Sequence, residues 1–325
     1  MGVRIKGLGF YVPGKRLTNF DLEKMVDTSD EWIRTRTGIQ ERRIASNDEA
    51  TSDLAYQAAV QALQRAQVKP EELDMIIVTT ATPDYLFPAT ACIVQSKLNA
   101  QNAACFDVEA ACPGFIYGLE IARGFLELPQ YRKVLVIGAE TLSRLVDWED
   151  RNTCVLFGDG AGAAVLEKDN TDHGIISSYL KGNGALGQLL ILPAGGSRRP
   201  ATQDTVQQRE HYIKMQGREV FKYAVTGMQE AALKTLERAH IKPEDITWLV
   251  PHQANIRIIE ATRERLGIPE HKVYVNIAKY GNTSAASIPI ALTEMVEEGK
   301  IKEGDLVLLV SFGAGFIYGG MLIKW

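Results

Sequence analysis

Short apolar runs alternate along the chain with amphipathic stretches of helical length. The runs predict ten strands, near residues 3–11, 74–80, 104–109, 133–139, 160–167, 174–181, 246–251, 273–277, 306–311 and 318–324. Short strands rich in Val and Ile that alternate with helices are typical of sheets covered on both faces. The hydrophobic pattern therefore predicts an α/β protein.

The same pattern occurs twice. Residues 62–78 and 235–250 each read as a helix end, a Lys-Pro-Glu turn and a buried strand, and they are 173 positions apart. The apolar strands at 134–137 and 307–310 have the same offset. Two matches at one offset indicate a duplicated α/β unit, with one half over residues 1–170 and the other over 171–325.

Three segments fall outside this repeat. The halves join at a polar, turn-rich linker near residues 168–175. Residues 140–156 and 183–212 are predicted to be irregular. Long irregular segments in compact enzymes are commonly functional, so we expect these two to lie near a site.

Cys112 is the first candidate for chemistry. It follows the strand-like segment 105–108 and precedes Pro113, which suits the first position of a helix. The positive end of a helix dipole favours thiolate, so we expect a lowered pKa and a nucleophilic role. The alternative is a buried structural cysteine, the role expected of Cys92 and Cys105.

His252 and Asn282 are the second and third candidates. His252 leaves a buried strand for an amide-rich turn, and it could donate a hydrogen bond to an oxyanion. It could equally be a satisfied strand-end histidine, and Asn282 alone would be a turn residue. However, the repeat places Cys112 opposite Ala285, three residues after Asn282. We therefore expect the three side chains to meet at the carboxyl ends of the strands.

Glycine-rich segments at 158–162 and 313–319 resemble nucleotide-binding loops only superficially. Neither has the G-x-G-x-x-G spacing between a strand and a helix. We expect tight turns, and at Phe312–Gly315 a backbone that brings N–H groups against a carbonyl oxygen.

Composition excludes several classes of protein. The chain has 46% hydrophobic and 23% charged residues, typical of a globular protein, and its net charge of −4 argues against binding nucleic acid. Since no apolar run has membrane-spanning length and no signal core is visible, we expect a cytoplasmic protein. The four cysteines fit neither a disulfide framework nor a metal site.

With these residues assembled, the whole chain resembles the β-ketoacyl-acyl-carrier-protein synthase III family. These condensing enzymes initiate bacterial type II fatty acid synthesis. The motifs that carry the resemblance are Gly9–Pro13, Asp30–Ile39, Phe87-Pro88, Glu109–Phe115, Phe157–Gly162, His252–Asn255, Tyr280–Ser287 and Ser311–Phe316. The resemblance implies a duplicated thiolase fold, a five-layer αβαβα sandwich, in a homodimer.

It also implies a reaction and its residues. Cys112 would take the acyl group of an acyl-CoA, and malonyl-acyl carrier protein would then lose carbon dioxide and attack the acyl-enzyme. His252 and Asn282 match the pair that holds the malonyl thioester oxygen. The backbone N–H groups of Cys112 and Ala314 match the oxyanion hole. Coenzyme A enters as part of a substrate, and no cofactor is expected.

The resemblance extends to substrate contacts. Trp32 and Arg151 would sandwich the adenine of coenzyme A, and Phe87 would reach across the dimer to the partner's acyl pocket. Other matches along the coenzyme A arm are Thr28, Arg36, Gly217, Phe221 and Asn255. The contacts expected for acyl carrier protein are Arg257, Lys214, Arg218 and Lys222.

Three alternatives remain at this stage. A thiolase-like acyltransferase that condenses without decarboxylation would usually carry a second active-site cysteine, whereas this chain has Asn282 in the corresponding loop. A non-catalytic homologue would be expected to lack Cys112 or His252. The third alternative is a priming synthase of secondary metabolism that uses an unusual acyl-CoA. The sequence barely distinguishes it from the enzyme that initiates fatty acid synthesis. The preferred acyl chain is also undetermined.

Overall fold

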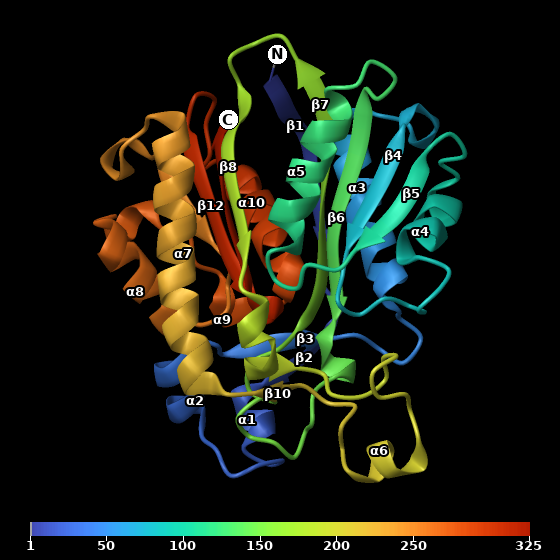
Figure 1. Cartoon of the computed structure of the whole chain (residues 1–325), viewed down its shortest axis with the longest axis vertical. Coiled ribbons are helices and arrows are strands. Elements are labelled where there is room, and N and C mark those ends of the chain that lie inside the picture. Colours follow the sequence, from blue (N-terminus) through green and yellow to red (C-terminus); the bar gives the residue numbers. More distant parts are fainter. Residues whose placement is uncertain (1) are drawn as a thin grey trace.

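Two β-sheets form the frame of the protein. The computed structural model describes residues 2–325 (Figure 1). The first sheet has the order β1-β7-β6-β4-β5, with strands Gly2–Tyr11, Asp159–Asp169, Lys133–Thr141, Met75–Thr79 and Ala104–Val108. The second has the order β11-β12-β13-β8, with strands Trp248–Pro251, Leu306–Gly313, Ile317–Lys324 and Gly174–Gly182.

Six helices complete the layers. Helices α3 (Thr51–Ala66) and α4 (Thr90–Leu98) cover the outer face of the first sheet. Helices α7 (Gly217–Ala239) and α8 (Ile256–Leu266) cover the outer face of the second. Between the sheets lie α5 (Gly114–Leu126) and α10 (Ser287–Glu297), visible in the middle of Figure 1. This arrangement is the predicted five-layer sandwich.

The near-continuous apolar strands follow from this layering. Along β6, Val134 and Val136 belong to the central core with α5 and α10, while Leu135 and Ile137 belong to the outer core with α3. Successive side chains point to opposite faces of a sheet, so a strand covered on both faces must be apolar throughout.

The repeat is confirmed for several pairs of elements. Helices α3 and α7 end at Ala66 and Ala239, and each is followed by a left-handed residue, Gln67 at φ 56° and His240 at φ 55°. Strand β11 corresponds to β4, β12 to β6, and α10 to α5, all near the offset of 173. The linker is a turn between β7 and β8. The division into units at residues 170 and 171 stays a prediction.

The predicted strand at 273–277 is wrong. Only a single bridge joins Val273 to Leu249, and the Tyr274 N–H donates to the Leu249 carbonyl. At Asn276 the backbone N–H donates instead to the side-chain oxygen of Gln253, 3.0 Å away. The chain leaves the sheet because a side chain takes over this hydrogen bond, so the second sheet has four strands.

The glycines at 158–162 were expected to form a tight turn, and this was also wrong. Gly160 and Gly162 lie within β7, where a Cβ on Gly162 would fall 2.7 Å from Pro289 of α10. Glycine here permits close approach of the central helix to the sheet.

Smaller elements cover the end of the sandwich at the bottom of Figure 1. They are β2 (Lys15–Thr18) paired with β3 (Glu41–Ile44), β9 (Leu190–Ile191) paired with β10 (Lys214–Met215), and the helices α1 (Asn19–Leu22), α2 (Asp30–Thr37), α6 (Gln203–Gln207) and α9 (Ile277–Tyr280). The two segments predicted to be irregular meet here, where Arg209 pairs with Asp147. In the described part of the chain, no helix is long and apolar enough to cross a membrane.

Candidate active site

Cys112 lies in a tight turn between β5 and α5. Ala111 has a φ of 41°, Pro113 caps the helix, and the helix begins at Gly114, one residue later than expected. The end of β12 packs directly on this turn, since a Cβ on Gly313 would lie 2.8 Å from the Cys112 nitrogen. Ala314 and Cys112 line the same cavity, as an oxyanion hole built from both residues requires.

His252 directly follows β11, fully buried. Its Nδ1 lies 2.7 Å from the Ser287 hydroxyl, which also accepts a hydrogen bond from the Gln253 N–H at 3.4 Å. In the tautomer in which the Ser287 hydroxyl donates to Nδ1, the imidazole hydrogen is on Nε2. Nε2 has no hydrogen-bond partner among the described residues, so it is available to a substrate oxygen.

Asn282 is oriented by its own loop. Its side-chain oxygen accepts from the Ser284 N–H at 2.8 Å. The side chain is buried, and its amide nitrogen is left to donate. Since His252 and Asn282 line one cavity with Cys112, the structure brings the three predicted residues together.

The pKa of the Cys112 thiol is shifted in the direction opposite to the one expected from the sequence. Burial raises the pKa of its thiol to about 12, against the opposing effect of hydrogen bonds. The expected lowering of the pKa is thus wrong for the free protein, because desolvation of the thiolate outweighs the helix terminus. Burial also lowers the pKa of His252 to about 3, so the imidazole is neutral at physiological pH.

Three neighbouring cavities share lining residues, and Cys112 lines two of them. A narrow one of about 100 Å³ contains Cys112, His252 and Asn282. It shares Gly217, Phe221 and other lining residues with an open cavity of about 790 Å³. On its other side it shares Cys112 with an apolar cavity of about 240 Å³, lined by Leu142, Leu145, Leu190, Ile191, Leu192 and Ile213 among others.

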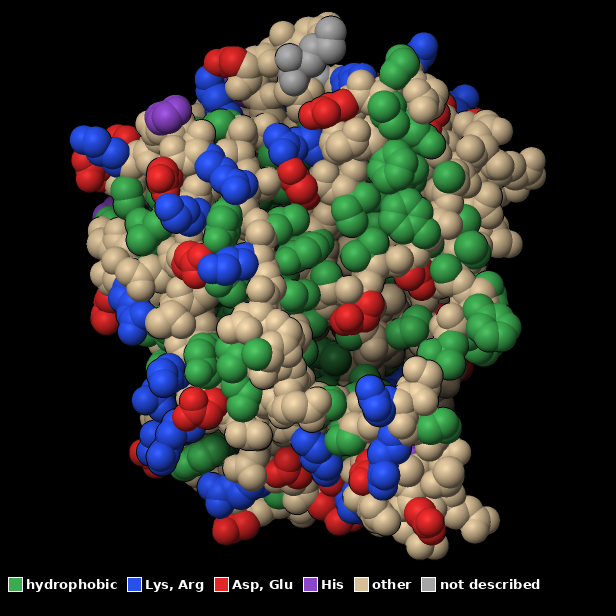
Figure 2. Space-filling model, viewed as in Figure 1, with side chains coloured by type: hydrophobic (Ala, Val, Ile, Leu, Met, Phe, Trp, Pro, Cys, Tyr) green, Lys and Arg blue, Asp and Glu red, His purple; other side chains and the backbone are tan. Residues whose placement is uncertain are grey.

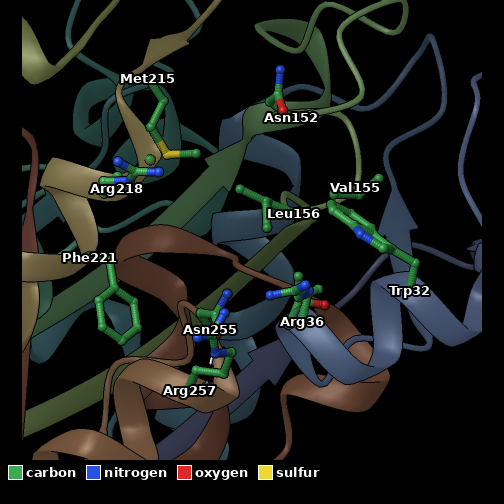
Figure 3. A pocket seen from close by; sticks show the side chains of 12 residues that line it. Trp32, Arg36, Asn152, Val155, Leu156, Met215, Arg218, Phe221, Asn255 and Arg257 are labelled. Atoms are coloured by element: carbon green, nitrogen blue, oxygen red, sulfur yellow. Dashed lines mark hydrogen bonds between the residues drawn. The ribbon is translucent and has the colours of Figure 1, made fainter.

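The open cavity is a basic mouth (Figure 3). Arg36 and Trp32 enter it from α2, Arg218 and Phe221 from α7, and Asn255 and Arg257 from the start of α8. The lining includes three arginines and no carboxylate. Such a surface suits phosphate groups, which arginine binds through paired N–H donors.

Trp32 and Arg151 stack on each other in this structure, and the sandwich of an adenine between them stays a prediction. The guanidinium of Arg151 lies 4.8 Å from the centre of the Trp32 ring, and it also approaches Asp27 at 3.7 Å. Stacked rings have centroids at least about 4.5 Å apart. A base between Trp32 and Arg151 needs two such separations, which is more than the distance between these groups. Adenine binding on both faces requires Arg151 to move.

The remaining predicted residues lie outside the three cavities or at their edge. Thr28 precedes α2, and its buried hydroxyl has no partner among the described residues. Lys214 faces Asp147 at 3.9 Å, and Lys222 lies over the Tyr223 ring. Phe87 lines none of these cavities and is 86% exposed.

Several residues at the site were missed by sequence reasoning. The apolar cavity draws all its leucines and isoleucines except Ile213 from the two irregular segments, where no periodicity reveals which side chains point inward. Ser284 and Ser287 stand within a recognised motif but had no assigned role. Glu140 directly follows the predicted apolar strand at 133–139, and this position is a sequence signal for a buried acid.

Comparison with known proteins identifies the family. A model described as 3-oxoacyl-[acyl-carrier-protein] synthase III matches residues 106–184, and its C-terminal counterpart matches residues 236–325. The β-ketoacyl-[acyl-carrier-protein] synthase III of Caldanaerobacter subterraneus subsp. tengcongensis is 60% identical over 321 residues, 99% of this chain and 97% of the relative. The chain belongs to the β-ketoacyl-acyl-carrier-protein synthase III family.

Solved structures agree with this assignment. The 3-oxoacyl-[acyl-carrier-protein] synthase III of Aquifex aeolicus VF5 is 52% identical, with a TM-score of 0.93 and full coverage of both chains. A priming β-ketosynthase of a polyketide biosynthetic pathway is also similar, at 36% identity and a TM-score of 0.91, over 99% of this chain and 96% of the other. As a synthase III, the chain is an acyltransferase of the thiolase-fold condensing type.

Proposed function

We propose that this synthase III condenses an acyl-CoA primer with malonyl-acyl carrier protein, and that Cys112, His252 and Asn282 carry out the two half-reactions. One observation supports the roles above all others. Cys112 stands where a narrow passage containing His252 and Asn282 meets an apolar cavity. An acyl group on the sulfur can occupy the apolar side while the second substrate arrives from the other.

In the first half-reaction, Cys112 attacks the thioester carbonyl and coenzyme A leaves. The backbone N–H groups of Cys112 and Ala314 are proposed to hold the developing oxyanion. Among the described residues, no carbonyl accepts the Cys112 N–H, so this donor is available. Arg36, at the mouth, would hold a phosphate of coenzyme A.

In the second half-reaction, malonyl decarboxylation leaves an enolate. His252 Nε2 and the Asn282 amide are proposed to donate to its oxygen. A neutral imidazole suits this role, because it donates a hydrogen bond without the cost of burying a charge. The enolate carbon then attacks the acyl-enzyme, which releases Cys112 and gives a β-ketoacyl product.

A homodimer is part of the proposal. The side chains of Tyr85, Leu86 and Phe87 are 62%, 85% and 86% exposed. Hydrophobic side chains also gather over α5 and the neighbouring edge of the sheet (Figure 2). Exposed apolar surface of this kind favours a protein interface. The cytoplasmic location and the lack of a cofactor stay predictions.

Incubation with acetyl-CoA followed by peptide mass spectrometry tests the proposal. We expect an acetyl adduct on the peptide containing Cys112, and none in Cys112→Ser. His252→Ala and Asn282→Ala should still acquire the adduct but lose malonyl decarboxylation by about 10²–10³-fold, the usual effect of removing one oxyanion donor. An adduct on Cys92, Cys105 or Cys154 would refute the assignment of the nucleophile.

A further inference from the structure

Glu294 carries a carboxyl group in the central layer of the sandwich. It belongs to α10, where its neighbours Leu292, Thr293 and Met295 have no solvent exposure, and Glu294 itself is only 7% exposed. It lies outside the three cavities of the site, whose described lining residues do not include it. A carboxylate in such a position is costly unless hydrogen-bond donors surround it, so its donors indicate its role.

Four donors surround this carboxyl group, and all of them come from one short segment of the chain. The Tyr280 hydroxyl and the Lys279 side-chain nitrogen lie 2.7 and 3.1 Å from Oε1. The Asn276 side-chain nitrogen and the Tyr274 hydroxyl lie 2.7 and 3.3 Å from Oε2. Burial raises the pKa of both tyrosines, so each hydroxyl keeps its hydrogen and donates it to the carboxyl group of Glu294.

Residues 274–280 depend on such contacts because they have little regular structure of their own. The Tyr274 N–H donates to the Leu249 carbonyl at 3.0 Å, and the chain then leaves the sheet. It continues into α9, a single helical turn over Ile277–Tyr280. One isolated turn is not stable in itself. The side-chain contacts to Glu294 therefore hold the segment on its path.

Asn282, one of the proposed oxyanion donors, follows this segment after a single residue. That residue is Gly281, whose φ of 64° lies in the left-handed region that glycine adopts without strain. The Asn282 N–H donates to the Leu156 carbonyl at 2.9 Å, and its carbonyl accepts the Gly158 N–H at 3.0 Å. The loop is thus fixed by backbone pairing at Asn282 and by the hydroxyl of Tyr280 two residues earlier.

Gln253 connects the same segment to the strand that precedes His252. Its side-chain oxygen accepts the Asn276 N–H at 3.0 Å. Its side-chain nitrogen donates to the carbonyls of Pro251 and Tyr274 at 2.8 and 3.2 Å. Pro251 is the last residue of β11 and directly precedes His252. The segment held by α10 is therefore tied to both proposed donors, directly along the chain to one and through Gln253 to the other.

We propose that Glu294 is a positioning residue for Asn282 in the decarboxylation half-reaction. The inference rests on the proposed function, because it assumes that Asn282 donates to the malonyl thioester oxygen. Glu294 holds residues 274–280 against α10 and thereby fixes where the Asn282 amide stands relative to His252 Nε2. The enolate oxygen must receive both hydrogen bonds at once, and a displacement of about 1 Å can lower a rate by about 10²-fold.

The four contacts explain why an acid occupies this position. A carboxylate accepts hydrogen bonds at both oxygens, whereas a glutamine side chain accepts at one oxygen and donates from its nitrogen. Whichever way the amide is turned in Glu294→Gln, its nitrogen faces two of the four donors. The change keeps the volume of the side chain but removes half of its acceptors, so we expect the segment to shift while the core stays packed.

The test compares the two half-reactions in Glu294→Gln. Acyl transfer is measured as formation of the acetyl adduct on Cys112, and decarboxylation as release of carbon dioxide from malonyl-acyl carrier protein. We expect kcat for decarboxylation to fall by about 10- to 10²-fold, while its KM and the rate of acyl transfer stay nearly unchanged. A purely structural role would slow both half-reactions alike. Equal losses in the two, or no loss in decarboxylation, would overturn the proposal.

Tyr280→Phe tests the same contact with a smaller change. It removes the hydroxyl that donates to Glu294 but keeps the aromatic ring, which packs edge-on against Phe10. Decarboxylation should slow by about threefold to tenfold, the usual effect of one hydrogen bond, and acyl transfer should again be retained. Decarboxylation at the wild-type rate in Tyr280→Phe would count against the proposal even if Glu294→Gln does not fold.

Glu298→Gln is the matched control. It makes the same change from acid to amide one helical turn later, where the side chain pairs with Lys300 at 2.7 Å and accepts only the Tyr274 hydroxyl from the segment. Its effect on decarboxylation should be small. A loss as large as that in Glu294→Gln would show that negative charge near the segment matters rather than the four contacts, and the proposal would fail.

Double variants show whether Glu294 acts through Asn282. In Asn282→Ala the donating amide is already absent, so the addition of Glu294→Gln should slow decarboxylation little further. In His252→Ala the same addition should keep most of its effect. A full additional loss in the Asn282→Ala background would mean that Glu294 acts by another route, which overturns its assignment as a positioning residue for Asn282.

The same measurements separate this inference from the proposed function. If Asn282→Ala decarboxylates malonyl-acyl carrier protein as fast as the wild type, the proposed function fails, and the inference fails with it. If Asn282→Ala loses decarboxylation while Glu294→Gln and Tyr280→Phe keep it, only the inference fails.

Discussion

At the scale of single residues, the site combines three ionisable groups whose preferred states are neutral: His252 and Glu140, which are fully buried, and Cys112, which is partly buried. Burial raises the pKa of Cys112 and Glu140 and lowers that of His252. The identities of Cys112 and His252 could be predicted because each leaves a strand in a distinctive sequence. Their protonation could not, since desolvation depends on side chains brought from many parts of the chain.

The opposite shifts of Glu140 and His252 give a prediction for stability. Between about pH 4.5 and 6.5, folded Glu140 holds a proton that it lacks when unfolded, and folded His252 lacks a proton that it holds when unfolded. The two effects cancel in the wild type. In Glu140→Gln the histidine is left uncompensated, so the free energy of unfolding should fall by about 1.4 kcal/mol per pH unit on acidification.

His252→Asn should show the opposite slope, because only Glu140 then titrates in this range. Urea unfolding at pH 4.5, 5.5 and 6.5 measures both slopes. Parallel curves for the wild type and both variants would show that these pKa shifts are absent in solution.

Among the elements, strands and helices with a clear hydrophobic periodicity were predictable. Short segments whose conformation depends on a single side-chain contact were not. Strand 273–277 failed because Gln253 takes the Asn276 N–H, an interaction that no hydrophobic pattern contains. The short paired strands β2 and β3 were missed, because their eight residues are too few to show a reliable alternation of hydrophobic and polar positions.

The junction between β12 and the cysteine turn gives an element-scale prediction. Gly313 is in extended conformation at φ −163°, which alanine also adopts, so Gly313→Ala tests contact alone. Its Cβ would crowd the Cys112 nitrogen and Pro113. We expect a loss of stability of about 1–3 kcal/mol and slower acyl transfer. Gly304→Ala is a control for backbone strain without contact, because a Cβ on Gly304 would meet no atom within 4 Å but the residue has a φ of 87°.

Equal acyl-transfer rates in Gly313→Ala and the wild type would show that the end of β12 does not position Cys112. The rate is measured as formation of the acetyl adduct over time, and stability is measured by thermal unfolding.

At the scale of the whole molecule, the local charge at the mouth of the site has the opposite sign to the net charge of the chain. The chain carries a net charge of −4, but the mouth is lined by Arg36, Arg218 and Arg257. A local basic patch can steer an acidic partner even when the whole protein repels it. Composition alone therefore gives no indication of where acyl carrier protein would bind.

Arg257→Glu tests the proposed carrier-protein contact. It should raise KM for malonyl-acyl carrier protein, most strongly at low salt, because electrostatic steering is screened by ions. Arg265→Glu makes the same charge change on α8 outside the mouth and should have little effect. With malonyl-CoA as acceptor, Arg257→Glu should lose much less activity. Equal losses with both acceptors would place the docking surface elsewhere.

The central layer has a consequence for how the protein comes apart. Helix α10 belongs to the second half but contacts β7 and β1 of the first, and α5 from the first half contacts β13 and β8 of the second. Neither half can cover the inner face of its own sheet with its own helix alone. A duplicated chain of this kind unfolds as one cooperative unit, so a calorimeter should record a single transition, and a half expressed alone should aggregate through its uncovered sheet.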